Sequence, residues 1–337
     1  MVLLLPLSLT LSPLASVAVL FAFISSSAKA VTIALVPGLT TDAFYITMHK
    51  GAIAAAEALG VELLFQGSPE WNASLQVPIL NAVIAKKPDA ILIAPNDKQQ
   101  LIAPLKAAAD AGIAVICVDT FIDDGVFQDG IGDGDFPISY VASDDVLGGV
   151  MAGHALANSI GKKGTVYVSN VKPGISTTDQ REEGFKAAMT NYPDITVLET
   201  QFNDDDANKA SAQVNAVVAR APDLAGIFGA NLFSAIGSAD GVKAMGKSGE
   251  IKVVAFDAPT RIVDDLKSGL IDLAIAQHPA EIGYMGVMVA FGHVTDNPVP
   301  VSIGTGFTVM TADNIDDPAI SKYVYSCLLY TSPSPRD

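Results

Sequence analysis

The stretch Val31–Gly60 constrains the fold more than any other part of the chain. It opens with a short apolar run, Val31–Val36, breaks at Pro37-Gly38, and continues with apolar residues at helical spacing. Gly60 ends the predicted helix, and a second apolar run, Val61–Phe65, follows at once. Such a strand–loop–helix–strand unit has a right-handed crossover. Its loop lies beyond the carboxyl end of the first strand, where open α/β sheets bind their ligands.

The same alternation continues along the chain and predicts parallel sheets that are covered by helices on both faces. Later strands are expected at Val61–Phe65, Ala90–Ala94, Ile113–Val118, Tyr140–Ala142, Thr165–Ser169, Thr196–Gln201, Leu224–Phe228, Lys252–Phe256 and Asp272–Ala276. Later helices are expected near Ser74–Ala85, Lys98–Ala111, Asp145–Ile160, Thr178–Tyr192, Asp206–Ala219, Ser234–Gly246, Arg261–Ser268 and Ala280–Gly292. Because 337 residues exceed what one core comfortably holds, two lobes are expected.

The two ends of the chain do not fit this pattern. Residues 1–30 hold a long apolar stretch followed by Ala28-Lys29-Ala30, a pattern typical of a secretory signal peptide and its cleavage site. An uncleaved membrane anchor is the alternative. Residues 326–337, SCLLYTSPSPRD, break the preceding pattern and are interpreted as a non-native tail. The sequence therefore predicts an exported protein whose fold spans about residues 31–325.

Charge and cysteine content exclude several classes of function. With 20 basic and 36 acidic residues the net charge is −16, which disfavours nucleic acid and anionic membranes as partners. The two cysteines are Cys117, in an apolar strand, and Cys327, in the tail, so neither a disulfide framework nor a metal cluster is predicted. The Gly- and Asp-rich stretch Ile122–Phe136 matches neither a calcium loop nor a phosphate loop, and a solvated loop is expected there.

Polar and aromatic side chains gather just beyond the carboxyl ends of the predicted strands. Because parallel strands end at the same edge of a sheet, these residues should converge on one crevice. Carboxylates accept hydroxyl protons, guanidinium and amide groups donate to oxygens, and aromatic rings cover C–H faces, so the set suits a small polyhydroxylated ligand. The candidate ligand-binding residues are Asp42, Phe44, Tyr45, Asp119, Arg181, Phe202, Asn231, Asp257 and Gln277. No metal site, cofactor or catalytic residue is predicted.

At these residues the chain resembles the type I periplasmic sugar-binding proteins of ABC transporters, the ribose- and galactose-binding group. The resemblance covers about Val31–Tyr325. It rests on Ile33-Ala34-Leu35-Val36, the run Ala142–Gly149, Arg181-Glu182-Glu183-Gly184-Phe185, Val254-Ala255-Phe256-Asp257 and Ile275-Ala276-Gln277. It implies an α/β fold of two Rossmann-like lobes with parallel sheets, hinged by three crossovers. The N-terminal lobe would comprise residues 31–142 plus 278–304, and the C-terminal lobe residues 143–277 plus 305–325.

The family's binding pattern carries over to single positions of this chain. The resemblance implies paired aromatic residues at Phe44 and Tyr45, a carboxylate at Asp119, a guanidinium clamp at Arg181 and a C-lobe aromatic residue at Phe202. Asn231, Asp257 and Gln277 match the remaining positions, and Asp42 matches the Asp of galactose binders rather than the Asn of ribose binders. Ala94 and Thr120 depart from the ribose pattern. Hexoses, other pentoses and polyols therefore stay open as ligands.

Each of these residues also has a simpler structural interpretation. Asp119 and Asp257 could cap helices, and Phe44 and Tyr45 could belong to the core. Arg181 could pair with a neighbouring glutamate at the surface. The run Thr177-Thr178-Asp179 is interpreted as a helix start.

Three functions follow from the same crevice. The first is a monomeric sugar receptor that closes two lobes around a monosaccharide or polyol and presents it to the permease of an ABC transporter, or to a chemoreceptor. The second is a periplasmic hydrolase that uses two crevice carboxylates, although the sequence offers no nucleophile–base pair or metal cluster. The third, a repressor's sensing domain, needs an amino-terminal DNA-binding helix-turn-helix where this chain has its export segment. The sequence favours the receptor, a protein that is not an enzyme.

Overall fold

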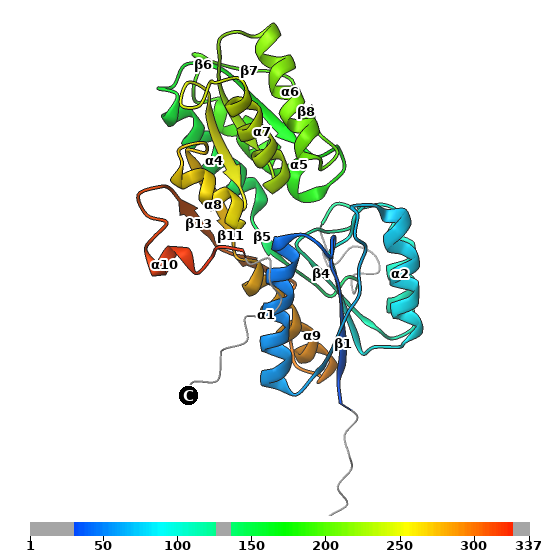
Figure 1. Cartoon of the computed structure of the whole chain (residues 1–337). Helices are drawn as coiled ribbons and strands as arrows, with labels where there is room; N and C mark the ends of the chain where they lie inside the picture. Colours follow the sequence, from blue (N-terminus) through cyan, green and yellow to red (C-terminus); the bar gives the residue numbers. More distant parts are fainter. Residues whose placement is uncertain (1–29, 126–135, 326–337) are drawn as a thin grey trace, which may run out of the picture.

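The structure, a computed structural model, describes residues 30–125 and 136–325. Within these ranges strands and helices alternate as the sequence predicts, and Figure 1 shows two lobes joined end to end. The expected export segment apart from Ala30, most of the stretch Ile122–Phe136, and the tail with Cys327 lie outside the described residues.

The N-terminal lobe is built on a six-stranded, fully parallel sheet with the order β12-β5-β4-β3-β1-β2. Its strands are β1 (Thr32–Val36), β2 (Glu62–Phe65), β3 (Ala90–Ile93), β4 (Ala114–Val118), β5 (Ser139–Ser143) and β12 (Ser302–Thr305). Its helices are α1 (Ala43–Leu59), α2 (Ala73–Ala85), α3 (Ile102–Asp110) and α9 (Pro279–Val294). Ile33 and Leu35 pack into the core that holds α1 and α9, whereas Ala34 and Val36 face α2 and α3. This alternation explains the continuous apolar run of β1, since both faces of the sheet are covered.

The C-terminal lobe is built on a seven-stranded sheet in which only β13, at one edge, runs antiparallel. Its order is β13-β11-β10-β9-β6-β7, and β8 also pairs with β6. Its strands are β6 (Gly164–Asn170), β7 (Ile195–Val197), β8 (Gln201–Phe202), β9 (Leu224–Gly229), β10 (Lys252–Phe256), β11 (Leu273–Gln277) and β13 (Phe307–Met310). Its helices are α4 (Asp145–Ser159), α5 (Ser176–Met189), α6 (Ala207–Arg220), α7 (Leu232–Ala244), α8 (Thr260–Lys267) and the short α10 (Pro318–Ser321).

Two details of the predicted elements were wrong. The single strand expected over Thr196–Gln201 is two short strands, β7 and β8, which pair separately with β6 and flank Thr200, whose hydroxyl donates to Glu182 at 2.5 Å. The edge strands β12 and β13 and helix α10 were not predicted. Both strands have only four residues; β12 (SIGT) has a single apolar residue, and β13 (FTVM) is mostly apolar but too short to be recognised from its sequence.

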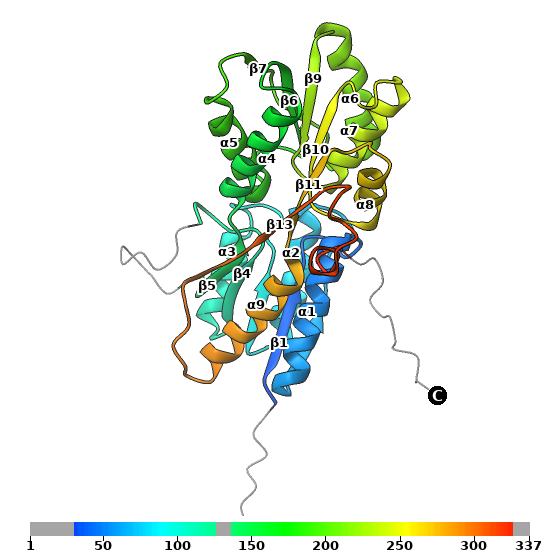
Figure 2. The same ribbon diagram turned by 90° about the vertical axis from the view of Figure 1, so that its left-hand side faces the viewer.

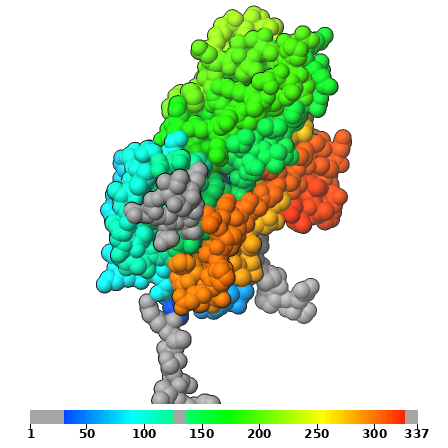
Figure 3. All heavy atoms as spheres, turned by 180° about the vertical axis from the view of Figure 1, so that it is seen from behind, coloured from blue at the N-terminus to red at the C-terminus, as the bar shows by residue number. Residues whose placement is uncertain are grey.

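The chain passes between the two sheets three times, after β5, after β11 and between β12 and β13. Figure 2 shows these passages gathered at the junction of the lobes, and in Figure 3 the last segments, orange to red, run from one lobe to the other. As a result, the carboxyl ends of the strands in both sheets face the same junction.

Two further predictions concern single features of this fold. Cys117 is fully buried in β4, as predicted, and burial raises the pKa of its thiol to about 12, which keeps it protonated and unreactive. In the ranges 30–125 and 136–325, no helix is both long enough and apolar enough to cross a membrane.

Candidate ligand-binding site

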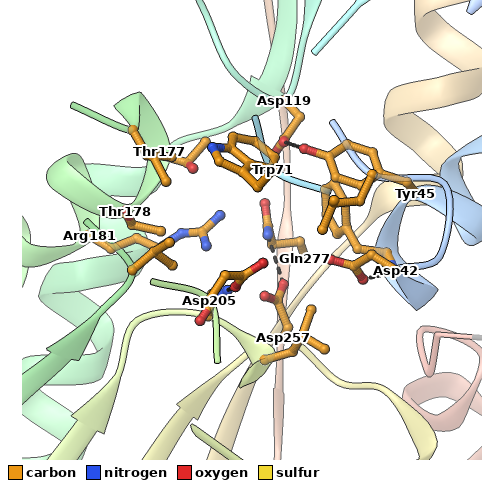
Figure 4. Close-up of a pocket in the computed structure, with 16 residues that line it drawn as sticks. Asp42, Tyr45, Trp71, Asp119, Thr177, Thr178, Arg181, Asp205, Asp257 and Gln277 are labelled. Carbon is orange, nitrogen blue, oxygen red and sulfur yellow. Dashed lines mark hydrogen bonds between the residues drawn. The ribbon is translucent and has the colours of Figure 1, made fainter. Parts of the chain in front are cut away.

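A pocket lies at the junction of the two lobes, and side chains from both line it (Figure 4). The lining comprises Leu39, Asp42, Phe44, Tyr45, Trp71, Asp119, Val171, Ile175, Thr177, Thr178, Arg181, Asp205, Asn231, Leu232, Asp257 and Gln277. All the candidate residues predicted from the sequence are among them except Phe202. The structure therefore brings together residues separated by more than 200 positions, as the strand-end argument predicts.

The first turn of α1 positions three of the predicted residues. Asp42 caps the helix, its carboxylate accepting the backbone N–H of Phe44 at 2.8 Å. Phe44 and Tyr45 meet edge to face with ring centroids 5.1 Å apart, and Tyr45 stacks on Trp71 at 6.3 Å. Both alternatives for the two rings hold at once, because they are buried in the core and also line the pocket. Trp71 was missed, although it lies in the loop after β2, because it is six residues beyond the end of that strand and the prediction took only residues close to the strand ends.

Asp119 and Asp257 do not cap helices. Each follows a strand directly and has a left-handed backbone, with φ of 63° and 75°. Asp119 accepts the hydroxyl of Tyr45 at 2.5 Å, and Asp257 accepts the side-chain amide of Gln277 at 2.8 Å. Burial raises the pKa of Asp119 to about 7, although Tyr45 and Arg181 act in the opposite direction. Burial likewise raises the pKa of Asp42 well above its ordinary value.

Arg181 is buried at the pocket, with 3% of its surface exposed, and is not a surface partner of the neighbouring glutamates. Its Nε donates to Asp145 at 2.7 Å, its Nη1 donates to the carbonyl of Ala230 at 3.0 Å, and its guanidinium lies 4.0 Å from the ring centre of Phe256. Burial opposes its charge, but Asp145 and the other carboxylates outweigh that effect and raise the pKa of Arg181. Arg181 therefore remains a cation within an acidic pocket.

Two glycines set the place of Arg181 by letting α4 and α5 approach closely. A Cβ on Gly149 would lie 2.1 Å from the carbonyl oxygen of Arg181, and a Cβ on Gly184 would lie 2.0 Å from the carbonyl oxygen of Val146. Only glycine fits at such distances. The sequence runs that carry the family resemblance thus include the contact that positions the guanidinium.

Tyr325 completes the support of Asp257. Its hydroxyl donates to Asp257 Oδ1 at 3.0 Å and accepts the backbone N–H of Gln277 at 2.9 Å, and its ring meets Phe44 edge to face at 5.8 Å. The side chain is fully buried. Sequence analysis missed this role because Tyr325 is 68 positions from Asp257, in a segment with no predicted element.

The loop after β8 contributes a different residue from the one predicted. Phe202 is half-buried and lies outside the pocket lining, and its carbonyl accepts the side chain of Gln213. Asp205 lines the pocket instead and accepts the side-chain amide of Asn231 at 2.7 Å. Burial raises the pKa of Asp205 to about 6. The structure therefore places the predicted segment beside the pocket but brings Asp205, and not Phe202, into the lining.

The prediction for the first turn of α5 was incomplete, because it gave the residues of this turn a structural role alone. The run Thr177-Thr178-Asp179 does lie in that turn, as predicted, since α5 begins at Ser176. Thr177 and Thr178 nevertheless line the pocket as well, and the hydroxyl of Thr178 is buried without a partner among the described residues.

Several polar atoms of the pocket have no partner among the described residues. Buried examples are the side-chain carbonyl oxygen of Gln277, the hydroxyl of Thr178 and the indole N–H of Trp71. Buried polar groups normally find hydrogen-bond partners, so these atoms indicate a ligand that supplies them. The four lining carboxylates demand donors, and the rings and aliphatic side chains offer apolar walls. Within the described residues, no cluster of His, Cys, Asp or Glu could hold a metal ion. The pocket is suited to a small molecule that is rich in hydroxyl groups.

Known proteins resemble this chain over most of its length. A family model described as "Periplasmic binding protein domain" matches residues 33–298. The D-ribose/D-allose-binding protein of Pseudomonas aeruginosa is 31% identical over 265 residues, which cover 77% of this chain and 80% of that protein. The ribose import binding protein of Salmonella typhimurium is 31% identical over 281 residues, covering 83% and 90%.

Solved structures agree with these sequence relatives. An ABC transporter solute-binding protein from Agrobacterium vitis, bound with α-D-tagatopyranose, is 67% identical and superposes with a TM-score of 0.86. The match covers 88% of this chain and 99% of that one. A solute-binding protein from Actinobacillus succinogenes with bound D-allose is 27% identical, with a TM-score of 0.77 over 84% of this chain and 98% of the other.

Proposed function

The chain belongs to the periplasmic binding protein family, and from that premise we propose that it is the sugar-binding component of an ABC importer. The observation that carries the proposal is the pocket between the lobes, where four carboxylates and unpartnered buried polar atoms demand hydroxyl donors beside aromatic rings. Monosaccharides combine many hydroxyl groups with apolar C–H faces, so they match both walls.

The sugar to test first is D-tagatose. The Agrobacterium vitis protein, 67% identical to this chain, was solved with α-D-tagatopyranose, whereas the ribose- and allose-binding relatives are 31% identical or less. A thermal-shift screen over pentoses, hexoses and polyols, followed by calorimetry, tests the assignment. A ligand at about 100 times its dissociation constant should add about 2.7 kcal/mol to the free energy of unfolding. If no sugar raises the unfolding temperature, the proposed function is wrong.

Binding rather than turnover is the proposed activity. Among the described residues that line the pocket, there is no serine, cysteine or histidine that could act as a nucleophile or base. A hydrolase using two of the carboxylates is the alternative, and it predicts that a glycoside of the bound sugar is cleaved. Recovery of the unchanged glycoside after prolonged incubation with the purified protein would exclude that alternative.

The proposed mechanism is closure of the lobes around the sugar. The assignment of residues 31–142 plus 278–304 to one lobe, and 143–277 plus 305–325 to the other, is supported by the membership of the two sheets. Asp119 and Phe44 then lie on one side of the sugar, and Arg181, Asn231 and Asp257 on the other. A ligand that contacts both sides binds the closed form better and shifts the population toward it.

Asp119→Ala tests this coupling, because it removes a contact of one lobe and leaves those of the other. Small-angle scattering should show a smaller radius of gyration for the wild type with saturating D-tagatose, and a weaker change for the variant. Full closure of the variant at saturation would mean that Asp119 does not couple the lobes.

We also place the protein in the periplasm, exported by residues 1–30, acting as a monomer that delivers its sugar to a membrane permease. In this proposal a chemoreceptor is a second partner that recognises the closed, sugar-bound form of the protein. Membership of a family of import binding proteins supports the location and the permease.

A further inference from the structure

Asp205 lies in a loop whose backbone aims one carboxylate into the pocket. Asp204 and Asp205 both have left-handed backbones, with φ of 56° and 64°. The loop is held by Asn203, whose side-chain carbonyl accepts the N–H of Asp205 at 2.9 Å and whose amide donates to Ser169 and Ser234. Glycine would adopt this backbone at lower cost. Of the two carboxylates only that of Asp205 lines the pocket, whereas that of Asp204 pairs with Lys209 at the surface.

The carboxylate of Asp205 has one oxygen in use and one available. Its Oδ1 accepts the amide of Asn231 at 2.7 Å, and no described residue donates to its Oδ2. The carbonyl of that same Asn231 side chain caps α7 by accepting the N–H of Ser234, which fixes the orientation of its amide. Asn231, predicted from the sequence as a sugar contact, is therefore also a positioning residue for Asp205.

Asp257 presents a second carboxylate beside the first. Figure 4 shows Asp205 and Asp257 next to one another below Gln277, and the charge of Asp257 acts on the ionisation of Asp205. Both donors to Asp257, Gln277 and Tyr325, use its Oδ1, so its Oδ2 has no partner among the described residues. The side-chain carbonyl of Gln277, which is 2% exposed, is a third unpartnered acceptor in the same corner.

We propose that Asp205 is a specificity-determining residue, and that with Asp257 it accepts hydrogen bonds from two adjacent hydroxyl groups of the sugar. This inference rests on the proposed function of the pocket. Two carboxylates fixed at the ends of different strands accept a vicinal diol only in one relative configuration. An epimer would leave a buried carboxylate without its donor, which is costly, whereas the aromatic wall accepts any pyranose face.

The four D-ketohexoses test the proposal directly, because D-tagatose, D-fructose, D-sorbose and D-psicose differ only at two adjacent hydroxyl-bearing carbons. Calorimetry should give the wild type at least a tenfold ratio between its tightest and weakest dissociation constants in this set. Asp205→Asn should weaken D-tagatose binding about 10- to 100-fold, the range for hydrogen bonds to a charged group. The same variant should also reduce the ratio between the weakest and the tightest dissociation constants of the four sugars to less than about threefold.

Asp204→Asn is the matched control, since Asp204 has the same backbone conformation in the same loop but is exposed and pairs with Lys209. It should leave both the affinity and the ratio unchanged. Asp205→Glu keeps the negative charge but moves it, so this variant should also lose its discrimination among the four sugars. It takes the place of Asp205→Asn if that variant fails to fold.

Three outcomes would overturn the inference. The first is a wild type that binds D-tagatose but does not discriminate among the four sugars. The second is an Asp205→Asn variant that weakens all four equally and keeps their ratio, which would make Asp205 a general contributor to the pocket. The third is a wild type that binds no sugar in the wider screen, and only this outcome would also overturn the proposed function.

Discussion

The two walls of the pocket are built differently. On the N-terminal wall the carboxylates already have partners, since Asp42 caps α1 and Asp119 accepts the hydroxyl of Tyr45, and only the indole N–H of Trp71 is buried without a partner among the described residues. On the C-terminal wall Gln277 and Thr178 keep buried atoms without partners among the described residues. The first wall is thus largely formed before a ligand arrives, and the second is completed by the ligand. We infer that the first selects for shape and the second for the arrangement of hydroxyl groups.

This difference follows from where the residues come from. Phe44 and Tyr45 belong to the core of the N-terminal lobe, so folding alone holds their rings in place. Asp205, Asn231 and Asp257 stand at strand ends and helix starts and are held by individual hydrogen bonds. Substitutions on the two walls should therefore separate loss of fold from loss of recognition.

The largest effect is expected for Arg181→Ala, the variant that removes the only basic side chain in the described pocket lining. Sugar binding should weaken by about 2–4 kcal/mol, for the lost charged donor and the partners left unpaired. Stability should also fall, by about 3–5 kcal/mol, because Asp145 is left as a buried carboxylate without its partner. Calorimetry and urea unfolding measure the two losses separately.

The double variant Arg181→Met/Asp145→Asn separates the two roles, since it removes the buried charge together with the guanidinium. Stability should largely return while sugar binding stays lost. Return of sugar binding would mean that Arg181 supports the fold and does not contact the ligand.

Much of the fold could be predicted from the sequence, because buried parallel strands leave an unmistakable pattern. Runs such as Ile113–Val118 and Val253–Phe256 are apolar and buried on both faces of their sheets. The pattern fails at the edges of the sheets. There β8, β12 and β13 are short and bury few side chains, so their residues carry little information about strand pairing.

The candidate site could be predicted where its residues lie directly at the ends of strands. Asp119, Asp257 and Gln277 follow or end strands directly, and the rule of strand ends finds them. Asp205 and Trp71 depend on loop conformation, and Tyr325 depends on a contact that joins distant parts of the chain. No local pattern encodes such contacts, which is why the sequence pointed to Phe202 in place of Asp205.

An intermediate effect is expected from pH, with opposite signs for stability and binding. Burial raises the pKa of Asp119 to about 7 and that of Asp205 to about 6, from about 3.9 in the unfolded chain. The folded protein therefore holds more protons between about pH 4 and 7, and these two groups make it less stable as pH rises through that window. Sugar hydroxyls donate best to ionised carboxylates, so affinity should increase over the same window.

Calorimetry in two buffers of different ionisation enthalpy measures the protons exchanged on binding. At about pH 6 the wild type should release protons when it binds the sugar, and Asp119→Asn should release fewer. The variant should also show a flatter dependence of stability on pH, since other carboxylates contribute equally to both proteins. Proton uptake by the wild type would contradict the assignment of these carboxylates as acceptors.

The smallest effect is expected at Phe202, and it sharpens the comparison because an aromatic residue on each lobe can be tested in the same way. Phe202→Leu should change sugar affinity less than twofold, since Phe202 lies outside the pocket lining. Trp71→Leu should weaken binding about tenfold, because Trp71 lines the N-terminal wall, stacks on Tyr45 and offers an unpartnered indole N–H. Calorimetry on both variants decides the matter. Equal losses would show that the C-terminal lobe also contributes an aromatic surface, and the division of the pocket into a wall of rings and a wall of polar groups would then be wrong.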